Sequence, residues 1–304
     1  MSTVKHFFLA PASARPLAFL RIGLASLLLI QAYFVAPVYL ELYGRMGILQ
    51  GALNDFFSPG IPNSGDMVRW LDRIGVGETA ALTAIGITYV LSVFLLLAGF
   101  KARLMAAVTW FLHLALTQSH TTAYGVDSYA HIMLFYLIWF PSKLMAAPSI
   151  EARLGLRVLQ IHLAIAYMAS GIEKGVGPQW WNGEAIWRSL ILPVYRQYDF
   201  SWLAGFPWVL KILGWGTLVV EGLYPFFIFP RQTRKVWLPL TVSLHVGIAV
   251  FLGLHLFAFL MILLNVALFG VSAEPGEISN RQPEFASPIA RLLGYVGRAP
   301  QANG

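Results

Sequence analysis

Cysteine is absent from this 304-residue sequence, and charged residues are scarce. The lack of cysteine excludes disulfide bonds, thiolate catalysis, and zinc or iron–sulfur sites with cysteine ligands. Only 12% of the residues are charged, whereas a soluble domain averages about 25%. Hydrophobic residues make up 58% of the chain. The composition therefore predicts an integral membrane protein that is built from α-helices and has the lipid bilayer as a partner.

Several common enzyme motifs are also missing from the chain. It has no credible phosphate-binding glycine loop, no HExxH motif and no nucleophile elbow. We predict no metal site. The net charge of +7 is interpreted as a signal for membrane orientation rather than as a nucleic-acid-binding patch, so no nucleic-acid partner is expected.

Long apolar runs divide the chain into membrane spans. A span needs about 20 mostly apolar residues, and the last apolar block, residues 236–269, is too long for one span, so we divide it near Gly253. A short interfacial helix is expected within 183–192. The predicted fold is an all-α polytopic bundle of about eight transmembrane helices: 17–40, 79–100, 104–123, 129–147, 154–174, 206–229 and the two halves of 236–269. Residues 1–16 and 272–304 are predicted to be the N-terminal tail and a polar C-terminal tail, flanking a transmembrane domain at 17–271.

The basic residues alternate along the predicted loops. Lysine and arginine are enriched on the cytoplasmic side of membrane proteins. They occur in the N-terminal tail and in every second connection, and neither of the short turns near Gly125 and Gly253 carries one. The first and fifth connections, which this pattern places outside, also contain some arginine. This pattern predicts that both termini are cytoplasmic. The residues that carry it are Lys5, Arg15, Lys101, Arg103, Lys143, Arg153, Arg157, Arg231, Arg234 and Lys235.

The end of the fifth predicted span is the most informative stretch. Lys174 follows a long apolar run, and glycine and proline breakers, then Trp180 and Trp181, come after it. A lysine there can snorkel to the surface, with the indoles forming an interfacial belt. However, Gln160 and Tyr167 precede Lys174 by fourteen and seven residues, a spacing that returns to nearly the same helix face. Ser170 joins this polar stripe, so we expect Lys174 to point into the bundle.

Other polar residues are expected to meet Lys174 in a cavity that opens outward. The predicted neighbours in the outer half are His120, Asp127 and His131. His245 is expected near mid-depth in the seventh span, and Glu221 in the inner half of the sixth. If Asp127 pairs with Lys174, the opposite charge favours the protonated lysine and the pair is structural. If Lys174 instead faces apolar walls, burial can lower its pKa toward the range of about 7–8 in which lysine acts as a base.

The sequence resembles the HTTM family, the transmembrane part of vitamin K-dependent gamma-glutamyl carboxylases and their small bacterial relatives. The motif that carries the resemblance is an apolar span that ends in Ser170-Gly171-Ile172-Glu173-Lys174 and is followed by a short breaker and tryptophan. Further support comes from Arg21-Ile22-Gly23, Glu221-Gly222-Leu223-Tyr224-Pro225 and His245. The resemblance spans roughly residues 16–270. It implies that Lys174 is a catalytic base and that reduced vitamin K or another quinone is the cofactor. It also places the chain in a bacterial plasma membrane.

The residues and the resemblance together leave three functional hypotheses open. The first is a carboxylase- or epoxidase-like membrane enzyme that acts on a quinone-like or exported peptide substrate. Its catalytic residues would be Lys174, His245, Asp127 and His131, and its substrate-binding residues would be His120, Tyr167, Trp180, Trp181 and Glu221. The large soluble domain of the carboxylases is missing, so full carboxylation of peptide glutamate is not expected. The second hypothesis is a non-catalytic maturation or partner factor for an exported peptide or toxin. The third is a transporter, or a haem protein that uses a histidine pair such as His113 and His245.

Overall fold

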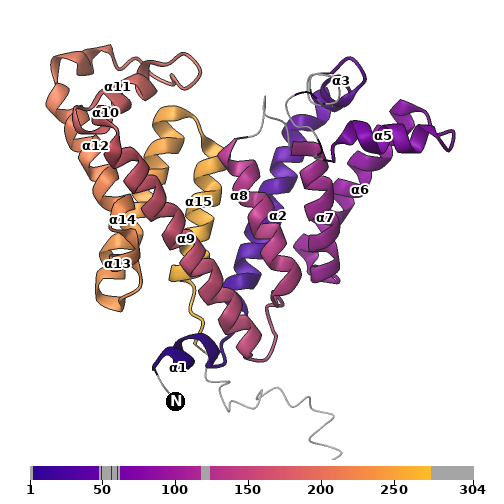
Figure 1. Cartoon of the computed structure of the whole chain (residues 1–304), viewed down its shortest axis with the longest axis horizontal. Coiled ribbons are helices and arrows are strands. Elements are labelled where there is room, and N and C mark those ends of the chain that lie inside the picture. Colours follow the sequence, from indigo (N-terminus) through magenta and orange to yellow (C-terminus); the bar gives the residue numbers. More distant parts are fainter. Residues whose placement is uncertain are drawn as a thin grey trace, which may run out of the picture. The chain divides into compact units, whose positions relative to one another are not determined.

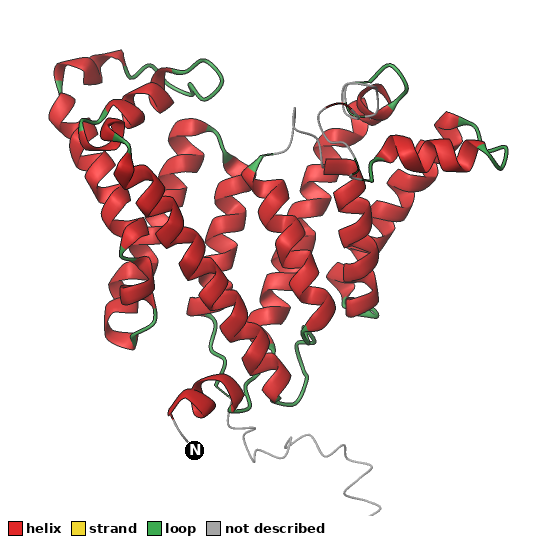
Figure 2. Cartoon of the chain, viewed as in Figure 1, coloured by secondary structure: helices red, strands yellow, loops and turns green. Residues whose placement is uncertain are grey.

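The computed structural model describes residues 3–47, 49, 56, 60, 62–117 and 124–274. Within these residues every regular element is helical, and the one isolated β-bridge joins Ala12 to Ser149. The chain divides into two units, residues 1–273 and 274–304, and the description below concerns the first. The all-helical class predicted from the composition is therefore confirmed (Figure 2).

The helices follow one another closely along the chain (Figure 1). Those before residue 140 are α1 Thr3–Leu9, α2 Arg15–Val35, the 3-10 turn η1 Ala36–Val38, α3 Tyr39–Tyr43, α5 Ser64–Asp72, α6 Glu78–Ala98, α7 Ala102–Thr117 and α8 Gly125–Trp139. Those after it are α9 Ile150–Val176, α10 Pro178–Trp181, α11 Glu184–Ile191, η2 Ser201–Gly205, α12 Pro207–Gly222, α13 Tyr224–Ile228, α14 Arg231–Leu252, α15 His255–Asn265 and the π-helical turn η3 Val266–Gly270.

Four helical segments are long and apolar enough to cross a membrane. They are Arg15–Tyr43, Glu78–Ala98, Ile150–Val176 and Arg231–Leu252. Each of the eight predicted spans contains a helix, but α7, α8, α12 and α15 are shorter than the spans predicted for them. The structure thus supports a membrane protein with these four candidate spans.

Prolines explain where the predicted spans were too long. Phe140 has extended backbone angles because Pro141 follows it, so α8 ends at Trp139 and not at residue 147. The sixth predicted span is interrupted at Leu223, two residues before Pro225, which divides it into α12 and α13. Pro37 lies in the 3-10 turn between α2 and α3. In each case proline ends or interrupts a helix that hydrophobicity alone would continue.

Two local predictions are confirmed, and one turn is corrected. Gly253 has a left-handed backbone (φ +69°) and lies between α14 and α15, as the split of the last apolar block required. The expected short helix within 183–192 is α11. Residues 62–63, although proline and asparagine are typical of turns, lead directly into α5. Asn63 caps that helix by accepting the backbone N–H of Asp66 at 3.1 Å.

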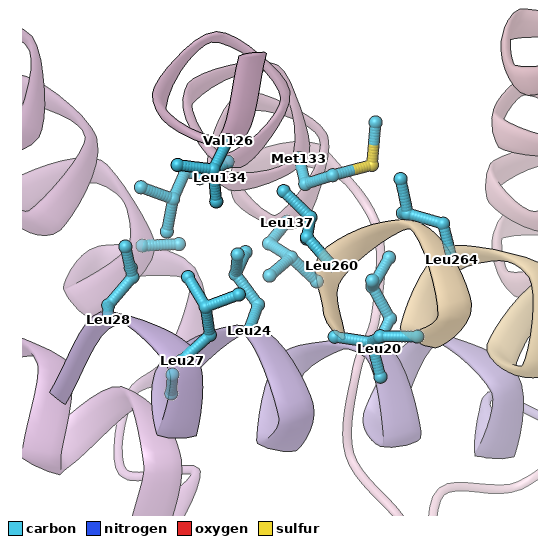
Figure 3. Close-up of a cluster of buried hydrophobic side chains, with 14 of the residues drawn as sticks. Leu20, Leu24, Leu27, Leu28, Val126, Met133, Leu134, Leu137, Leu260 and Leu264 are labelled. Atoms are coloured by element: carbon cyan, nitrogen blue, oxygen red, sulfur yellow. The ribbon is translucent and has the colours of Figure 1, made fainter. Parts of the chain in front are cut away.

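The helices pack in two neighbouring sets that α15 connects. Helices α2, α6, α7 and α8 contact one another, as do α9, α12, α13 and α14, while α15 packs against α14, α2 and α8. Figure 3 shows the apolar centre between α2, α8 and α15, where Leu24, Leu134 and Leu260 are fully buried. Since lipid is as apolar as leucine, interlocking side chains, rather than removal from water, stabilise this contact within a bilayer.

Arg21 is a buried cation that ties three parts of the fold together. Its guanidinium donates to the carbonyl oxygens of Leu96 and Leu97, the latter at 2.6 Å, and to that of Ser142 at 3.1 Å. The two leucines lie in the last turn of α6, where carbonyl oxygens lack the N–H donor of a following helical turn. A cation there also complements the negative end of the helix dipole. Arg21 therefore anchors α2 to the end of α6 and to the segment that follows α8.

Candidate functional site

Lys174 points into the helix bundle, as predicted from the polar stripe. Its Nζ donates to Glu221 Oε2 at 2.7 Å and to Ser170 Oγ, one turn earlier on α9. Nζ also lies 5.4 Å from the ring centroid of Trp180. The Lys174 side chain is 23% exposed and that of Glu221 is 9% exposed, so the pair is largely withdrawn from the surface. Lys174 is thus an interior ion-pair residue rather than a snorkelling lysine.

The end of α9 places Trp180 against Lys174. Helix α9 stops at Val176, and Gly177 has an extended backbone that turns the chain. Pro178 then starts α10, where its missing N–H costs nothing. This abrupt turn returns Trp180 to the lysine, while Trp181 is 53% exposed and its indole nitrogen donates to the carbonyl oxygen of Gly175 at 2.8 Å. Trp180 therefore contacts the site directly, whereas Trp181 fastens the turn.

The carboxylate partner of Lys174 is Glu221 and not Asp127. We expected Glu221 in the inner half of its span and Lys174 at the outer end of another, but the ion pair places the two side chains at one level. The cause is a close crossing of α9 and α12 at Gly171 and Gly222. A Cβ on Gly171 would lie 2.6 Å from the Cα of Gly222, so a glycine at this position allows the backbones to touch.

A hydrogen-bonded chain extends the site across α9, α13, α14 and α15. Asn265 Nδ2 donates to the carbonyl oxygen of Met261 at 2.8 Å, which fixes its amide orientation. The same nitrogen donates to the hydroxyl oxygen of Tyr167 at 2.8 Å, and Asn265 Oδ1 accepts from the hydroxyl of Tyr224 at 2.7 Å. Because Tyr167 accepts from the amide, its own proton is free for His245 Nε2, 2.6 Å away.

This arrangement determines which nitrogen of His245 carries the proton. Since Nε2 accepts from Tyr167, a neutral imidazole is protonated at Nδ1. No described residue pairs with Nδ1, although His245 is only 3% exposed. A buried donor without a partner is costly, and such groups are found where a ligand or a water completes the site. His245 Nδ1 is therefore a buried N–H donor that no described residue satisfies.

Asp127 and His131 of α8 belong to a second polar cluster, whose other members lie on α2 and α7. Asp127 Oδ1 accepts from Gln31 Nε2 of α2 at 2.7 Å. His131 stacks on Trp110 of α7, with ring centroids 4.8 Å apart, and no described residue pairs with its Nδ1. These contacts of Asp127 and His131 thus come from α2 and α7, and the ion-pair partner of Lys174 is Glu221. His120, the third predicted neighbour, lies outside the described residues.

His113 belongs to the second cluster as well. Its Nε2 donates to the carbonyl oxygen of Asp127 at 3.3 Å, and its Nδ1 accepts from the hydroxyl of Tyr89 at 3.2 Å. Both ring nitrogens thus have protein partners, which leaves neither open to a haem iron in this arrangement. Among the described residues, no three His, Asp or Glu side chains gather closely enough for a metal site.

Two residues of the hydrogen-bonded chain at His245, Asn265 and Tyr224, were not predicted to be part of the site. An indication in the sequence existed for Asn265 only. Asn265 interrupts an apolar run, and a polar side chain within a span commonly faces a functional interior. Tyr224 gave no such signal, because tyrosine is frequent at membrane interfaces. Both residues are fully buried. The hydroxyl of Tyr224 and the amide of Asn265 complete the chain that orients His245.

The chain can be compared with known proteins at the level of family models, sequences and structures. Protein-family models, curated proteins and solved structures yield no match to this chain. The candidate site is therefore described by its own residues: the Lys174–Glu221 ion pair between α9 and α12, and the hydrogen-bonded chain of Asn265, Tyr167 and His245 that joins α15, α9 and α14.

Proposed function

We propose that this chain is a multi-pass protein of a bacterial plasma membrane, with about eight membrane-crossing helices and both termini in the cytoplasm. The eight helices that coincide with the predicted spans support this proposal. The basic residues of the N-terminal tail and of the connections at 101–103, 143–157 and 231–235 support the orientation, as does their absence from the turns near Gly125 and Gly253. The four shorter helices would cross a bilayer together with the segments that continue them, as α13 continues α12.

The function that the site favours best is acid–base chemistry on a lipid-soluble or membrane-delivered substrate. The observation that carries this proposal is the Lys174–Glu221 pair, with Nζ and Oε2 2.7 Å apart inside an apolar bundle. Ionised groups are expensive there unless they serve a purpose, and such pairs frequently mark sites of proton transfer. The resemblance to the carboxylases suggests a hydroquinone as the substrate class.

Lys174 and Glu221 have different roles in this mechanism. In the described arrangement Glu221 Oε2 accepts a hydrogen bond from Lys174 Nζ at 2.7 Å. When a substrate excludes water, transfer of one proton from Lys174 to Glu221 leaves two neutral groups, and the amine can then remove a proton from a substrate hydroxyl. The open Nδ1–H of His245 donates a hydrogen bond to an oxygen of the bound molecule. Ser170 and Trp180 hold the lysine side chain in position.

A turnover assay tests this proposal. The purified protein in lipid nanodiscs would be mixed with reduced vitamin K under air, and the oxidised products separated by chromatography. We expect turnover above the protein-free rate, with a loss of at least about 100-fold in Lys174→Ala, which removes the base. Lys211→Ala is the control, because Lys211 is an exposed lysine on α12. Equal rates for wild type and Lys174→Ala, or no turnover in wild type, would contradict the proposal.

A non-catalytic maturation or partner factor is the second candidate. The close crossing at Gly171 and Gly222 favours it, because the ion pair then serves to hold α9 against α12. In that case the double variant Lys174→Met, Glu221→Leu would keep the cellular phenotype as long as it folds. Substitutions in the connection 182–206, which would bind the partner, would abolish the phenotype. Loss of the phenotype in a folded double variant would instead favour the enzyme. An absorption band of haem in the purified protein would revive the third hypothesis.

A further inference from the structure

Helix α5 is a short helix that carries an exposed tryptophan beside one end of a candidate membrane span. It ends at Asp72, and the span formed by α6 begins at Glu78. Within α5 and the turn that follows it, Trp70 is 62% exposed and Ile74 is 65% exposed. The Lys174 site uses none of these residues, so the exposed apolar side chains need an explanation of their own.

The beginning of α6 defines the level at which α5 lies. Helix α6 has 21 residues, which at 1.5 Å per residue gives about 32 Å, close to the hydrocarbon thickness of a bilayer. A crossing by α6 therefore puts Glu78 at one edge of the bilayer. The turn before it is closed by two hydrogen bonds. Gly75 N–H donates to the carbonyl oxygen of Asp72 at 2.9 Å, and Val76 N–H donates to that of Leu71 at 3.1 Å. This turn holds α5 at the level of that edge.

The direction of α5 is that of a helix in the plane of a membrane surface. Figure 1 shows α5 lying across the end of α6, whereas α2, α6 and α7 run in a common direction. The buried side chain of Val68 and the partly buried side chain of Leu71 pack α5 against the core of the first helix set. A helix that lies across the end of a span follows the surface of the bilayer rather than crossing it.

Two flanks of α5 differ in polarity. Helical spacing puts Met67 and Trp70 on one flank, and Ile74 follows on the same side just past the end of the helix. The other flank carries Asp66 and Arg69, whose side chains form an exposed ion pair at 2.6 Å. Amphipathic helices that lie on membranes have this division, with tryptophan on the apolar flank and charges on the polar one. The two flanks therefore fit the lipid side and the water side of one interface.

A second segment brings an apolar side chain to the same level. The backbone N–H of Arg45 donates to the carboxylate of Glu78, which places the turn after α3 beside the beginning of α6. Met46, the next residue along the chain, is 96% exposed. Two separate segments thus present Met46, Trp70 and Ile74 at one end of α6. Lipid favours apolar side chains there, whereas water does not.

We propose that α5 is an interfacial anchor that lies in the surface of the lipid bilayer. Trp70 and Ile74 enter the boundary between the head groups and the acyl chains, while Arg69 stays in water. The partner is the lipid surface, because α5 is attached to a span whose own exposed side chains, among them Ile87 and Phe94, are apolar. The proposal is independent of the chemistry proposed for Lys174 and of the side of the membrane on which α5 lies.

Spin labels at single cysteines test this position, since the chain contains no cysteine of its own. The full-length protein in phosphatidylcholine nanodiscs would carry one nitroxide, introduced through Trp70→Cys, Ile74→Cys or Arg69→Cys. Its accessibility to oxygen and to a water-soluble nickel complex gives its depth. We expect the labels at positions 70 and 74 about 5–10 Å below the phosphates, and the label at position 69 in water. Ile87→Cys is the reference for the bilayer interior, because Ile87 is 62% exposed on α6.

Three results would overturn the proposal. If the nickel complex reaches the label at position 70 as readily as the label at position 69, the apolar flank faces water. If neither reagent reaches the label at position 70, a second copy of the chain or another protein covers that flank. If the nickel complex reaches the label at position 87, α6 does not cross the bilayer and α5 has no interface to lie in.

The native side chain of Trp70 allows a second measurement that needs no label. The difference in fluorescence between the wild type and Trp70→Phe isolates the emission of this one indole. Phosphatidylcholine with bromine atoms near the start of its acyl chains should quench this difference, because the bromines and the indole lie at similar depth. Trp70→Phe should keep the wild-type unfolding temperature, since Trp70 is exposed. An unquenched difference in a folded variant would show that Trp70 does not enter the bilayer.

Discussion

At the residue scale, Lys174 and Glu221 are charged side chains in an environment unlike that of surface charges. They share a short ion pair and are mostly withdrawn from solvent. Several nearby groups depend on them, because Ser170 bonds to the same Nζ and Trp180 lies beside it. Replacing one partner by an apolar residue therefore leaves an unpaired charge in apolar surroundings. Replacing both partners leaves no unpaired charge.

The ion pair should show strong coupling in a double-mutant cycle. Lys174→Met or Glu221→Leu alone should lower the unfolding free energy by about 3 kcal/mol, because the remaining charge is buried without its partner. The double variant should cost less than the sum of the single changes. Unfolding in mixed detergent micelles measures these values. The exposed pair Arg188–Glu184 is the control and should couple by no more than about 0.5 kcal/mol. Additive effects of Lys174 and Glu221 would show that the ion pair does not form.

The hydroxyl of Tyr167 should be essential for the buried chain. Tyr167→Phe keeps the ring, which stacks on Tyr224 with centroids 4.1 Å apart, but leaves His245 Nε2 and Asn265 without a shared partner. We expect a loss of about 1–3 kcal/mol in unfolding free energy. Tyr33→Phe is the matched control, since Tyr33 is 74% exposed. If both variants unfold alike, then the chain contributes nothing to stability.

At the scale of the elements, the crossing of α9 and α12 decides the composition of the site. Neither helix contains the site alone, since Lys174 comes from one and Glu221 from the other. Trp215 of α12 also donates its indole N–H to the carbonyl oxygen of Trp181 at 2.9 Å, which holds the turn after α9. The geometry of this single helix pair thus places the acid, the base and the indole together.

Added volume at the crossing should separate the two helices. Gly171→Ala would place a methyl group against the backbone of Gly222, and because backbone atoms cannot rotate away we expect a loss of about 1–3 kcal/mol. The Lys174–Glu221 coupling should fall with it. Gly175→Ala lies one turn later on the same helix with no atom within 4 Å of the new Cβ, so it should be neutral or slightly stabilising. The opposite ranking of the two variants would contradict the described crossing.

At the scale of the whole molecule, the orientation in the membrane can be tested separately from the site. Reporter fusions after Gly125 and after Trp181 should both report the outside of the cell, while one in the 231–235 loop should report the cytoplasm. The reason is that lysine and arginine are retained on the cytoplasmic side, and the turn at Gly125 carries none. An inside signal from either of the first two fusions would refute the arrangement with eight spans.

The sequence alone determined the helical class, the positions of the apolar helices and the inward direction of Lys174. These features depend on composition and on helical spacing, both of which are local. The break at Gly253 was also predictable, because a block of 34 residues exceeds one span. Helix ends near Pro141 and Pro225 could have been predicted better had the effect of proline been given more weight than hydrophobicity.

Only the tertiary structure decided which residues meet. Residues 47 positions apart form the Lys174–Glu221 pair, and no periodicity within one helix reveals which face of another it will contact. The same limit explains why Asp127 pairs with Gln31 of α2, and why Asn265 orients His245 through Tyr167. In a bilayer all apolar faces are nearly equivalent, so small residues such as Gly171 and buried hydrogen bonds choose the partners. That choice is a property of the packed bundle, because each contact needs two helices already in place.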